Sequence, residues 1–318
     1  MYLRAVVILL LFTLQSCALT PQSTQLPDAN APVVPAEKVA AVMQVVILAS
    51  EDIPAYSEVA RVLTKKIGRR SRVYYLSGSP LENLKTVNQF KNEENIQIVS
   101  IGLNAALATK TLANKQVVFC QVYNHQDHAL LSPKHKGVSM LPSLPKTFSA
   151  WRALSPRTTD IGIISGPGFD DMMQAARAAA KSHGFTLHHT TVNSDKEYQY
   201  AYKNMSKKVQ GYWLLPDNRV LSENTLRDIM NFSVRNSKQV AVFNNEILKL
   251  GGLFSVSSDY QDIAHHVNAR LEQSQMSETI PGPDIVPLDK LKLRINPVMA
   301  KNLDLKIPKQ YRKFAHAL

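Results

Sequence analysis

Short apolar runs alternate with segments of helical periodicity along most of the chain. The stretch Thr159–Gly184 shows this clearly, because an apolar run of strand length, Ile161–Ser165, is followed by a Gly-Pro-Gly turn. Apolar residues then recur at helical spacing from about Phe169, and Gly184 stands where a helix C-terminus favours glycine. The stretch therefore predicts a strand–turn–helix unit.

A second stretch, Gln44–Gly68, repeats this unit 116 residues earlier. At that offset the run Val45–Ser50 falls on Ile161–Gly166, and Gly68 falls on Gly184. We interpret the match as a structural pseudo-repeat, which predicts two similar α/β lobes.

Each unit opens its own series of alternating strands and helices. In the first series, strands are expected at Val45–Ala49, Arg72–Leu76, Ile96–Ile101, Gln116–Tyr123 and Gly137–Leu141, with helices at Ala55–Ile67, Leu81–Lys91, Ala105–Ala113 and Phe148–Leu154. In the second, strands are expected at Ile161–Ser165, Phe185–Val192, Gly211–Leu215, Gln239–Phe243, Leu253–Ser257 and Lys292–Ile295, with helices at Lys196–Lys207, Leu221–Arg235 and Tyr260–Glu272. Such alternation is typical of parallel sheets covered by helices on both faces. The expected fold class is α/β, with two Rossmann-like lobes joined by a hinge around an interlobe cleft.

The first 17 residues have the organisation of a bacterial secretion signal. Arg4 precedes the apolar run Ala5–Leu14, which is too short to span a bilayer and ends in Leu-Gln-Ser-Cys. This ending resembles the lipobox of bacterial lipoproteins, in which a small residue precedes a cysteine whose thiol carries a diacylglycerol. It predicts lipidation of Cys17 and a membrane anchor of fatty acyl chains such as palmitate. The alternative is an ordinary secretory signal peptide with an incidental cysteine.

The next segment, Ala18–Val42, is rich in Pro, Gln, Thr and Ala and is expected to be an unstructured tether. Ala18 in place of Asp favours the outer membrane over the inner one. The predicted location is therefore the cell envelope, on the periplasmic side.

Composition limits the classes of function that this protein can have. A length of 318 residues suits two domains, and 45% apolar residues is normal for a globular protein. The formal net charge of +12 is spread along the chain without the aromatic-studded basic patch that single-stranded nucleic acid requires, so no nucleic-acid partner is expected. Once Cys17 is lipidated, Cys120 has no disulfide partner and is expected to be a buried strand residue.

Four segments, in order along Val45–Pro308, resemble one bacterial family. They are Ser100–Ala108, Leu215–Asn218, Val242–Leu253 and the tail Leu293–Pro308. Together they are similar to the ABC-transporter substrate-binding proteins of periplasmic-binding-protein type I, some of which are linked to aromatic amino acids. The resemblance implies a ligand between the lobes, delivery to a membrane permease and no enzymatic activity.

The chain departs from this family's pattern at two expected cleft positions. Leu103 stands where the family has Thr, and Asn124-His125 stands where it has Asp-Pro. The substitution at Asn124 removes a charge that would pair with a ligand ammonium, and charge-assisted hydrogen bonds are about twice as strong as neutral ones.

In two-lobed α/β proteins the ligand binds at the carboxyl ends of the strands. The loops at those ends supply the candidate ligand-binding residues: Ser50, Glu51, Tyr56, Gly102, Asn104, Tyr123, Asn124, Ser165, Gly166, Asp217, Asn218, Asn244 and Glu246. Backbone amides at Gly102 and Gly166 suit a carboxylate, Asp217 or Glu246 an ammonium, and Tyr56 or Tyr123 an aromatic ring. The pair Asp217-Asn218 is equally typical of a turn and helix cap, and Gly166-Pro167-Gly168 of a simple tight turn.

No metal site, cofactor or catalytic residue is expected. His125, His128 and Asp127 have ligand residue types without a second motif at zinc spacing, and adjacent histidines of a helix, His265-His266, point apart. The sequence also lacks a nucleophile elbow and a P-loop.

Two functions remain open. The first is a lipid-anchored extracytoplasmic solute-binding protein of an ABC-type transporter, with a small polar or aromatic, amino-acid-like ligand and a permease as partners. The second is an envelope lipoprotein that uses the same fold to dock a partner protein such as a receptor or sensor kinase. The expected domains are the signal peptide 1–17, the tether 18–42, a first lobe of 43–152 plus about 254–280, and a second lobe of 153–253 plus about 281–318.

Overall fold

The computed structural model describes residues 43–315 of the chain. The predicted signal peptide, Cys17 and the tether lie outside the described residues. Between residues 43 and 315, no helix combines the length and apolar character needed to cross a membrane.

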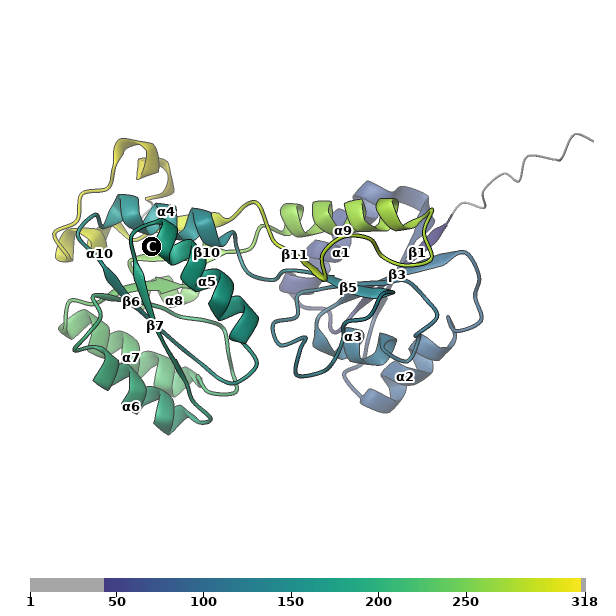
Figure 1. Cartoon of the computed structure of the whole chain (residues 1–318), viewed down its shortest axis with the longest axis horizontal. Coiled ribbons are helices and arrows are strands. Elements are labelled where there is room, and N and C mark those ends of the chain that lie inside the picture. Colours follow the sequence, from purple (N-terminus) through teal and green to yellow (C-terminus); the bar gives the residue numbers. More distant parts are fainter. Residues whose placement is uncertain (1–42, 316–318) are drawn as a thin grey trace, which may run out of the picture. The chain divides into compact units, whose positions relative to one another are not determined.

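The first sheet, sheet A, has six parallel strands (Figure 1). In spatial order they are β11 (Ile285–Val286), β5 (His135–Val138), β4 (Val117–Cys120), β3 (Ile96–Ile101), β1 (Gln44–Ala49) and β2 (Ser71–Tyr75). Both faces of this sheet are buried, because β1 sends Val45, Ile47 and Ala49 into one apolar cluster and Val46 and Leu48 into another.

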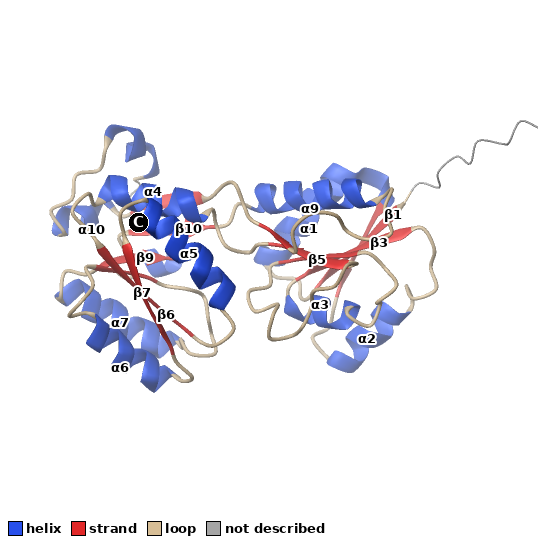
Figure 2. Ribbon diagram, viewed as in Figure 1, coloured by secondary structure: helices blue, strands red, loops and turns tan. Residues whose placement is uncertain are grey.

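Helices cover the two faces of sheet A in pairs (Figure 2). On one face lie α1 (Pro54–Ile67) and α9 (Tyr260–Ser274), which pack on each other. On the other lie α2 (Pro80–Asn88) and α3 (Leu103–Thr109). A short 3-10 turn, Gly68–Arg70, follows α1.

The second sheet, sheet B, has the same strand order with its own elements. It runs β12 (Lys292–Ile295), β10 (Phe254–Ser257), β9 (Gln239–Val242), β8 (Gly211–Trp213), β6 (Asp160–Ser165) and β7 (Thr186–Thr191). All pairings are parallel except that of β12 with β10. One face packs against α4 (Leu144–Leu154), α5 (Asp170–Ser182), α10 (Pro297–Asn302) and the 3-10 segment Lys309–Phe314, and the other against α6 (Asp195–Met205), α7 (Glu223–Arg235) and α8 (Asn245–Leu248).

The two sheets confirm the predicted pseudo-repeat. Shifting β1 by 116 residues gives the bounds of β6, and shifting α1 gives α5 to within one residue at its end. The strand orders correspond as well, since β3-β1-β2 in sheet A matches β8-β6-β7 in sheet B.

The chain passes between the sheets three times: from β5 to α4, from β10 to α9 and from β11 to β12. Three segments therefore lie elsewhere than the expected lobe boundaries placed them. Strand β10 belongs to sheet B and β11 to sheet A, and α4 packs on sheet B, where Trp151 meets Phe254 edge-on. Hydrophobic periodicity reports that a segment is buried, but not which sheet buries it.

Strand β4 ends earlier than its apolar run predicts. Gln121 adopts a left-handed conformation with φ of 59°, which terminates the ladder at Cys120. Cys120 is fully buried, and burial raises the pKa of its thiol to about 12. The thiol is therefore an unreactive apolar group, as expected.

Candidate ligand-binding site

A cavity of about 490 Å³ lies at the carboxyl ends of strands from both sheets. Five of the residues predicted from the sequence line it: Tyr56, Tyr123, Asn124, Asp217 and Asn218. Four further lining residues matter for the chemistry of the cavity and were not predicted from the sequence: Gln121, Phe169, Arg219 and Phe243.

The strongest electrostatic interaction in this cavity joins Asp217 to Arg219. Arg219 donates from Nε to Oδ1 of Asp217 at 2.8 Å and from Nη2 to Oδ2 at 2.9 Å, while Oδ2 also accepts the Gly166 N–H at 2.8 Å. Both carboxylate oxygens of this buried aspartate are thus engaged, and the hydrogen bonds raise the pKa of the Arg219 guanidinium. The role predicted for Asp217, pairing with a ligand ammonium, is taken within the protein by Arg219.

Arg219 also connects the loops of the two sheets. Its Nη1 donates to Asp127, in the loop after β4, at 3.2 Å, and its Nη2 donates to the Pro167 carbonyl at 2.9 Å. Gly168 lies directly against Asp127: it has φ of 85°, and an added Cβ would come within 2.2 Å of Asp127 Oδ1. Only glycine fits there, which accounts for the second glycine of the Gly-Pro-Gly turn.

The loop after β4 supplies amide groups to the cavity. Asn124 Nδ2 lies 3.2 Å from His128 Nε2, which leaves its side-chain oxygen available as an acceptor. Gln121 donates from Nε2 to the Ala55 carbonyl at 3.2 Å. A non-glycine residue held at positive φ beside a cavity is characteristic of functional positions, and a polar residue inside the apolar run Gln116–Tyr123 was the sequence signal for it.

Aromatic side chains form the apolar walls. The rings of Tyr123 and Phe169 lie 6.2 Å apart between centroids, and the Arg219 guanidinium lies 5.5 Å from the Phe169 centroid. Partial burial, and secondarily the charge of Glu51, raise the pKa of Tyr56, so its hydroxyl stays protonated and available as a donor. The cavity therefore combines flat apolar surfaces with neutral hydrogen-bonding groups.

Four predicted residues are buried in the scaffold beneath the cavity. Ser50 accepts the Ala105 N–H through Oγ at 2.9 Å, and Gly102, with φ of 86°, lies close to both Ser50 and Tyr56. Ser165 donates from Oγ to the Gly166 carbonyl and lies 2.9 Å from His189 Nε2. These residues do not line the cavity; they hold the loops that do.

The remaining four predicted residues lie outside the cavity lining. Glu51 is exposed, and Asn104 is partly buried in the first turn of α3. Asn244 caps α8 by accepting the Ile247 N–H at 2.8 Å. The Glu246 side chain is 79% exposed and pairs with Lys249 at 2.9 Å. It does not line the cavity.

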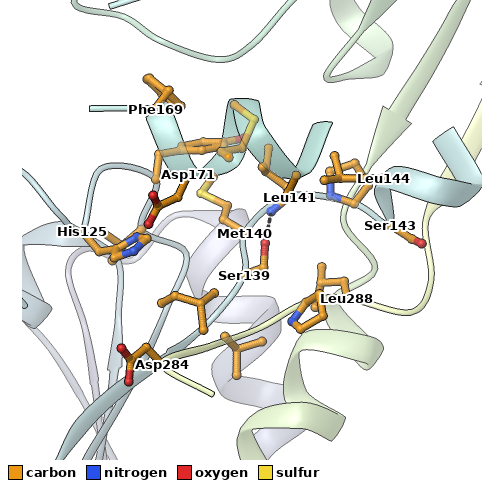
Figure 3. Close-up of a pocket in the computed structure, with 18 of the residues that line it drawn as sticks. His125, Ser139, Met140, Leu141, Ser143, Leu144, Phe169, Asp171, Asp284 and Leu288 are labelled. Atoms are coloured by element: carbon orange, nitrogen blue, oxygen red, sulfur yellow. Dashed lines mark hydrogen bonds between the residues drawn. The ribbon is translucent and has the colours of Figure 1, made fainter. Parts of the chain in front are cut away.

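Figure 3 shows the lining of a second cavity, of about 460 Å³. It is bordered by α5 and by the chain crossings that follow β5 and β11, with Met140, Leu141 and Leu288 among its apolar lining. The two cavities share four lining residues: Val122, Tyr123, Met140 and Phe169. His125 and Asp171 lie at the polar end of the second cavity, where burial lowers the His125 pKa and Gln126 donates to Asp171.

Two α/β sheets of matching strand order, linked by three crossings with a cavity at their strand ends, define a binding protein of periplasmic-binding-protein type I. The chain belongs to the ABC transporter substrate binding protein family, whose sequence profile matches residues 67–317. Members of this family are solute-binding components of transporters and not enzymes.

Solved structures share the fold at low sequence identity. An ABC domain from Streptococcus pneumonia in complex with L-Trp is 18% identical, with a TM-score of 0.61 over 86% of this chain and 98% of that one. A substrate binding protein with adhesive properties from Clostridium difficile, in its ligand-free, open form, is 14% identical, with a TM-score of 0.66 over 86% and 99%. A conserved domain protein from Vibrio cholerae is 19% identical, with a TM-score of 0.59 over 86% and 98%. No curated protein matches the sequence.

Proposed function

We propose that this chain is a lipid-anchored extracytoplasmic binding protein that takes a small amino-acid-like ligand with an aromatic or polar side chain in the 490 Å³ cavity. The observation that carries the proposal is the cavity's composition: aromatic walls from Tyr56, Tyr123 and Phe169 beside amide groups from Asn124 and Asn218. The volume suits a small molecule. The L-Trp bound by the streptococcal structure is in keeping with such a lining.

The charges around the cavity favour a ligand without net charge. Asp217 and Arg219 are the charged residues of the cavity lining, and they neutralise each other through direct contacts. The lining itself therefore carries no net charge. Asn124, which is neutral, agrees with this balance. A zwitterionic or neutral ligand would be held through dipoles at its polar end and by stacking at its ring.

The ligand proposal is tested by thermal denaturation of the purified full chain against amino acids and aromatic metabolites. A ligand present at about 100 times its Kd stabilises the folded state by about 2.7 kcal/mol, which raises Tm by several degrees. L-tryptophan, L-tyrosine and L-phenylalanine are the first candidates.

Matched variants locate the binding site. Asn218→Ala and Asn124→Ala each remove a polar lining group and are expected to weaken binding about tenfold. Glu246→Ala removes a strand-end side chain that lies outside the cavity and should leave the Kd unchanged. Equal losses in all three variants, or no stabilising ligand in the panel, would contradict the proposal and favour the partner-docking alternative.

The anchor is proposed from Leu14–Cys17 and is tested separately. Cells fed a labelled fatty acid should incorporate it into the wild-type chain, and the chain should sediment with membranes. Cys17→Ser should abolish the label, whereas Cys120→Ser, at the other cysteine, should retain it. A labelled Cys17→Ser chain would refute the anchor without affecting the ligand proposal.

A further inference from the structure

Three side chains of metal-ligand type converge outside the residues that line the two cavities. Asp262 and His266 lie one turn apart on α9, and Asp289 lies in the crossing from β11 to β12. His266 Nε2 is 3.3 Å from Asp289 Oδ2 and 3.9 Å from Asp262 Oδ1. One donor atom from each residue falls within 4.8 Å of the other two.

Asp262 is fixed in place by the crossing itself. Its side chain is only 2% exposed, and its Oδ2 accepts the backbone N–H groups of Asp289 and Lys290 at 2.8 Å each. Oδ2 is therefore occupied, and Oδ1 is the oxygen nearest to His266. A carboxylate held by hydrogen bonds in this way is a pre-oriented ligand.

His266 has a buried ring nitrogen without a hydrogen bond. Within residues 43–315, Nε2 is shielded from solvent and makes no hydrogen bond of acceptable geometry, although both carboxylates are near. Buried polar atoms are nearly always satisfied, and an exception points to a group that completes the site, such as an ion. The imidazole of His266 and the two carboxylates would supply such a group with one nitrogen and two oxygen ligand atoms.

From this arrangement we propose a site for a divalent transition-metal cation, of which Zn²⁺ is the representative, with Asp262, His266 and Asp289 as its protein ligands. Imidazole nitrogen and carboxylate oxygen are ligands that zinc accepts at about 2.0–2.2 Å. Two ligands at that distance from a tetrahedral centre lie about 3.4 Å apart, close to the His266–Asp289 separation. The Asp262–His266 separation closes by about 0.5 Å when the ion binds, and water fills the fourth position.

The residue types of this cluster suit zinc better than calcium. Calcium takes six to eight oxygen ligands, whereas this cluster offers two carboxylates and a nitrogen. Zinc, cobalt and nickel accept such mixed sets. A bound cation ties α9, on sheet A, to the chain entering β12 of sheet B, and so fixes one of the three crossings.

The test is a Zn²⁺ titration of the purified full chain at about pH 7.5, where imidazole is largely neutral, followed by calorimetry and repeated with Co²⁺ for its visible absorption. The wild-type chain should show a saturable site. Asp289→Asn and His266→Gln should each weaken that site about 10–100-fold. Glu272→Gln, on the same helix but exposed and outside the cluster, should leave the Kd unchanged.

Asp289→Asn is the decisive variant, because its side chain is 74% exposed and its loss should not affect folding. The proposal is overturned if the wild-type chain shows no saturable binding, if Asp289→Asn binds as tightly as wild type, or if Glu272→Gln loses affinity equally. Because these residues do not line the ligand cavity, the outcome is independent of the proposed function.

Discussion

At the scale of single residues, the structure changes the roles predicted for charged side chains, because it shows which groups they pair with. Asp217 is 6% exposed and Glu246 is mostly exposed, although both were predicted to pair with a ligand ammonium. The difference arises because Arg219, two residues after Asp217, folds back onto it. A sequence shows which charges are present but not which of them are neutralised.

Replacing Arg219 should therefore be costly. Arg219→Met leaves a buried carboxylate with only two backbone donors, the N–H groups of Gly166 and of residue 219, and we expect a loss of about 2–3 kcal/mol in the free energy of unfolding. Glu246→Gln, which breaks an exposed pair, should leave the urea midpoint unchanged. Urea unfolding followed by circular dichroism compares them; an Arg219→Met midpoint equal to that of Glu246→Gln would contradict the assignment.

Stability should fall in mild acid because of buried histidines. Burial lowers the pKa of His135, so its folded form binds a proton less readily than its unfolded form. Neutral His135 therefore contributes fully to the free energy of unfolding when the pH is above the pKa of histidine in the unfolded chain, about 6.5. This contribution is lost as the pH falls through the lowered pKa of the folded form.

His135→Gln, whose amide can still donate to the Leu112 carbonyl, should reduce the fall of Tm between about pH 7 and pH 5. Thermal denaturation across that range measures the slope. The exposed His265→Gln serves as control and should keep the wild-type slope; a His135→Gln slope as steep as wild type would show that burial of this ring is not responsible.

At the scale of elements, the strand–turn–helix units depend on close approach at the turns. Gly102 precedes α3 with φ of 86°, and an added Cβ would lie 2.6 Å from Ser50 Oγ and 2.8 Å from Tyr56 Cζ. Gly78 has nearly the same φ, 83°, with no atom within 4 Å of the Cβ position. The two glycines thus have similar φ and differ in packing.

Gly78→Ala should cost about 1 kcal/mol, the penalty of the left-handed conformation for a residue with Cβ. Gly102→Ala should cost about 1–3 kcal/mol more, because Ser50 and Tyr56 must move. Urea unfolding compares the two variants, and equal midpoints would refute the close approach.

At the scale of the whole molecule, sheet B depends on residues from the end of the chain. β12 pairs with β10 over four residues, and Ile295 and Ala300 are buried in the cluster that contains Phe254. Removing them would uncover the edge of β10 and its apolar face, and exposed strand edges promote aggregation.

We therefore expect a chain of residues 43–290 to be insoluble and a chain of residues 43–315 to be soluble and folded. Expression of both, followed by sedimentation and circular dichroism, gives the comparison. A soluble, folded shorter chain would show that sheet B is complete without its last strand.

The sequence predicted most elements correctly and predicted less of the site. It missed β11 and α8, which are two and four residues long, because segments so short carry no periodic signal. It placed Tyr56, Tyr123, Asn124, Asp217 and Asn218 at the cavity from their positions at strand ends alone. It did not find Arg219 or Phe169, because their places depend on how the loops of two sheets meet.

By itself, then, the sequence determined the strands and helices, the repeated α/β unit and the family. It could do so because burial produces hydrophobic periodicity and turns require particular residue types along the chain. Only the tertiary structure decided which sheet each of α4, β10 and β11 joins, which charges pair, and that Asp262, His266 and Asp289 meet. These are contacts between residues distant in sequence, and no local pattern encodes their distances.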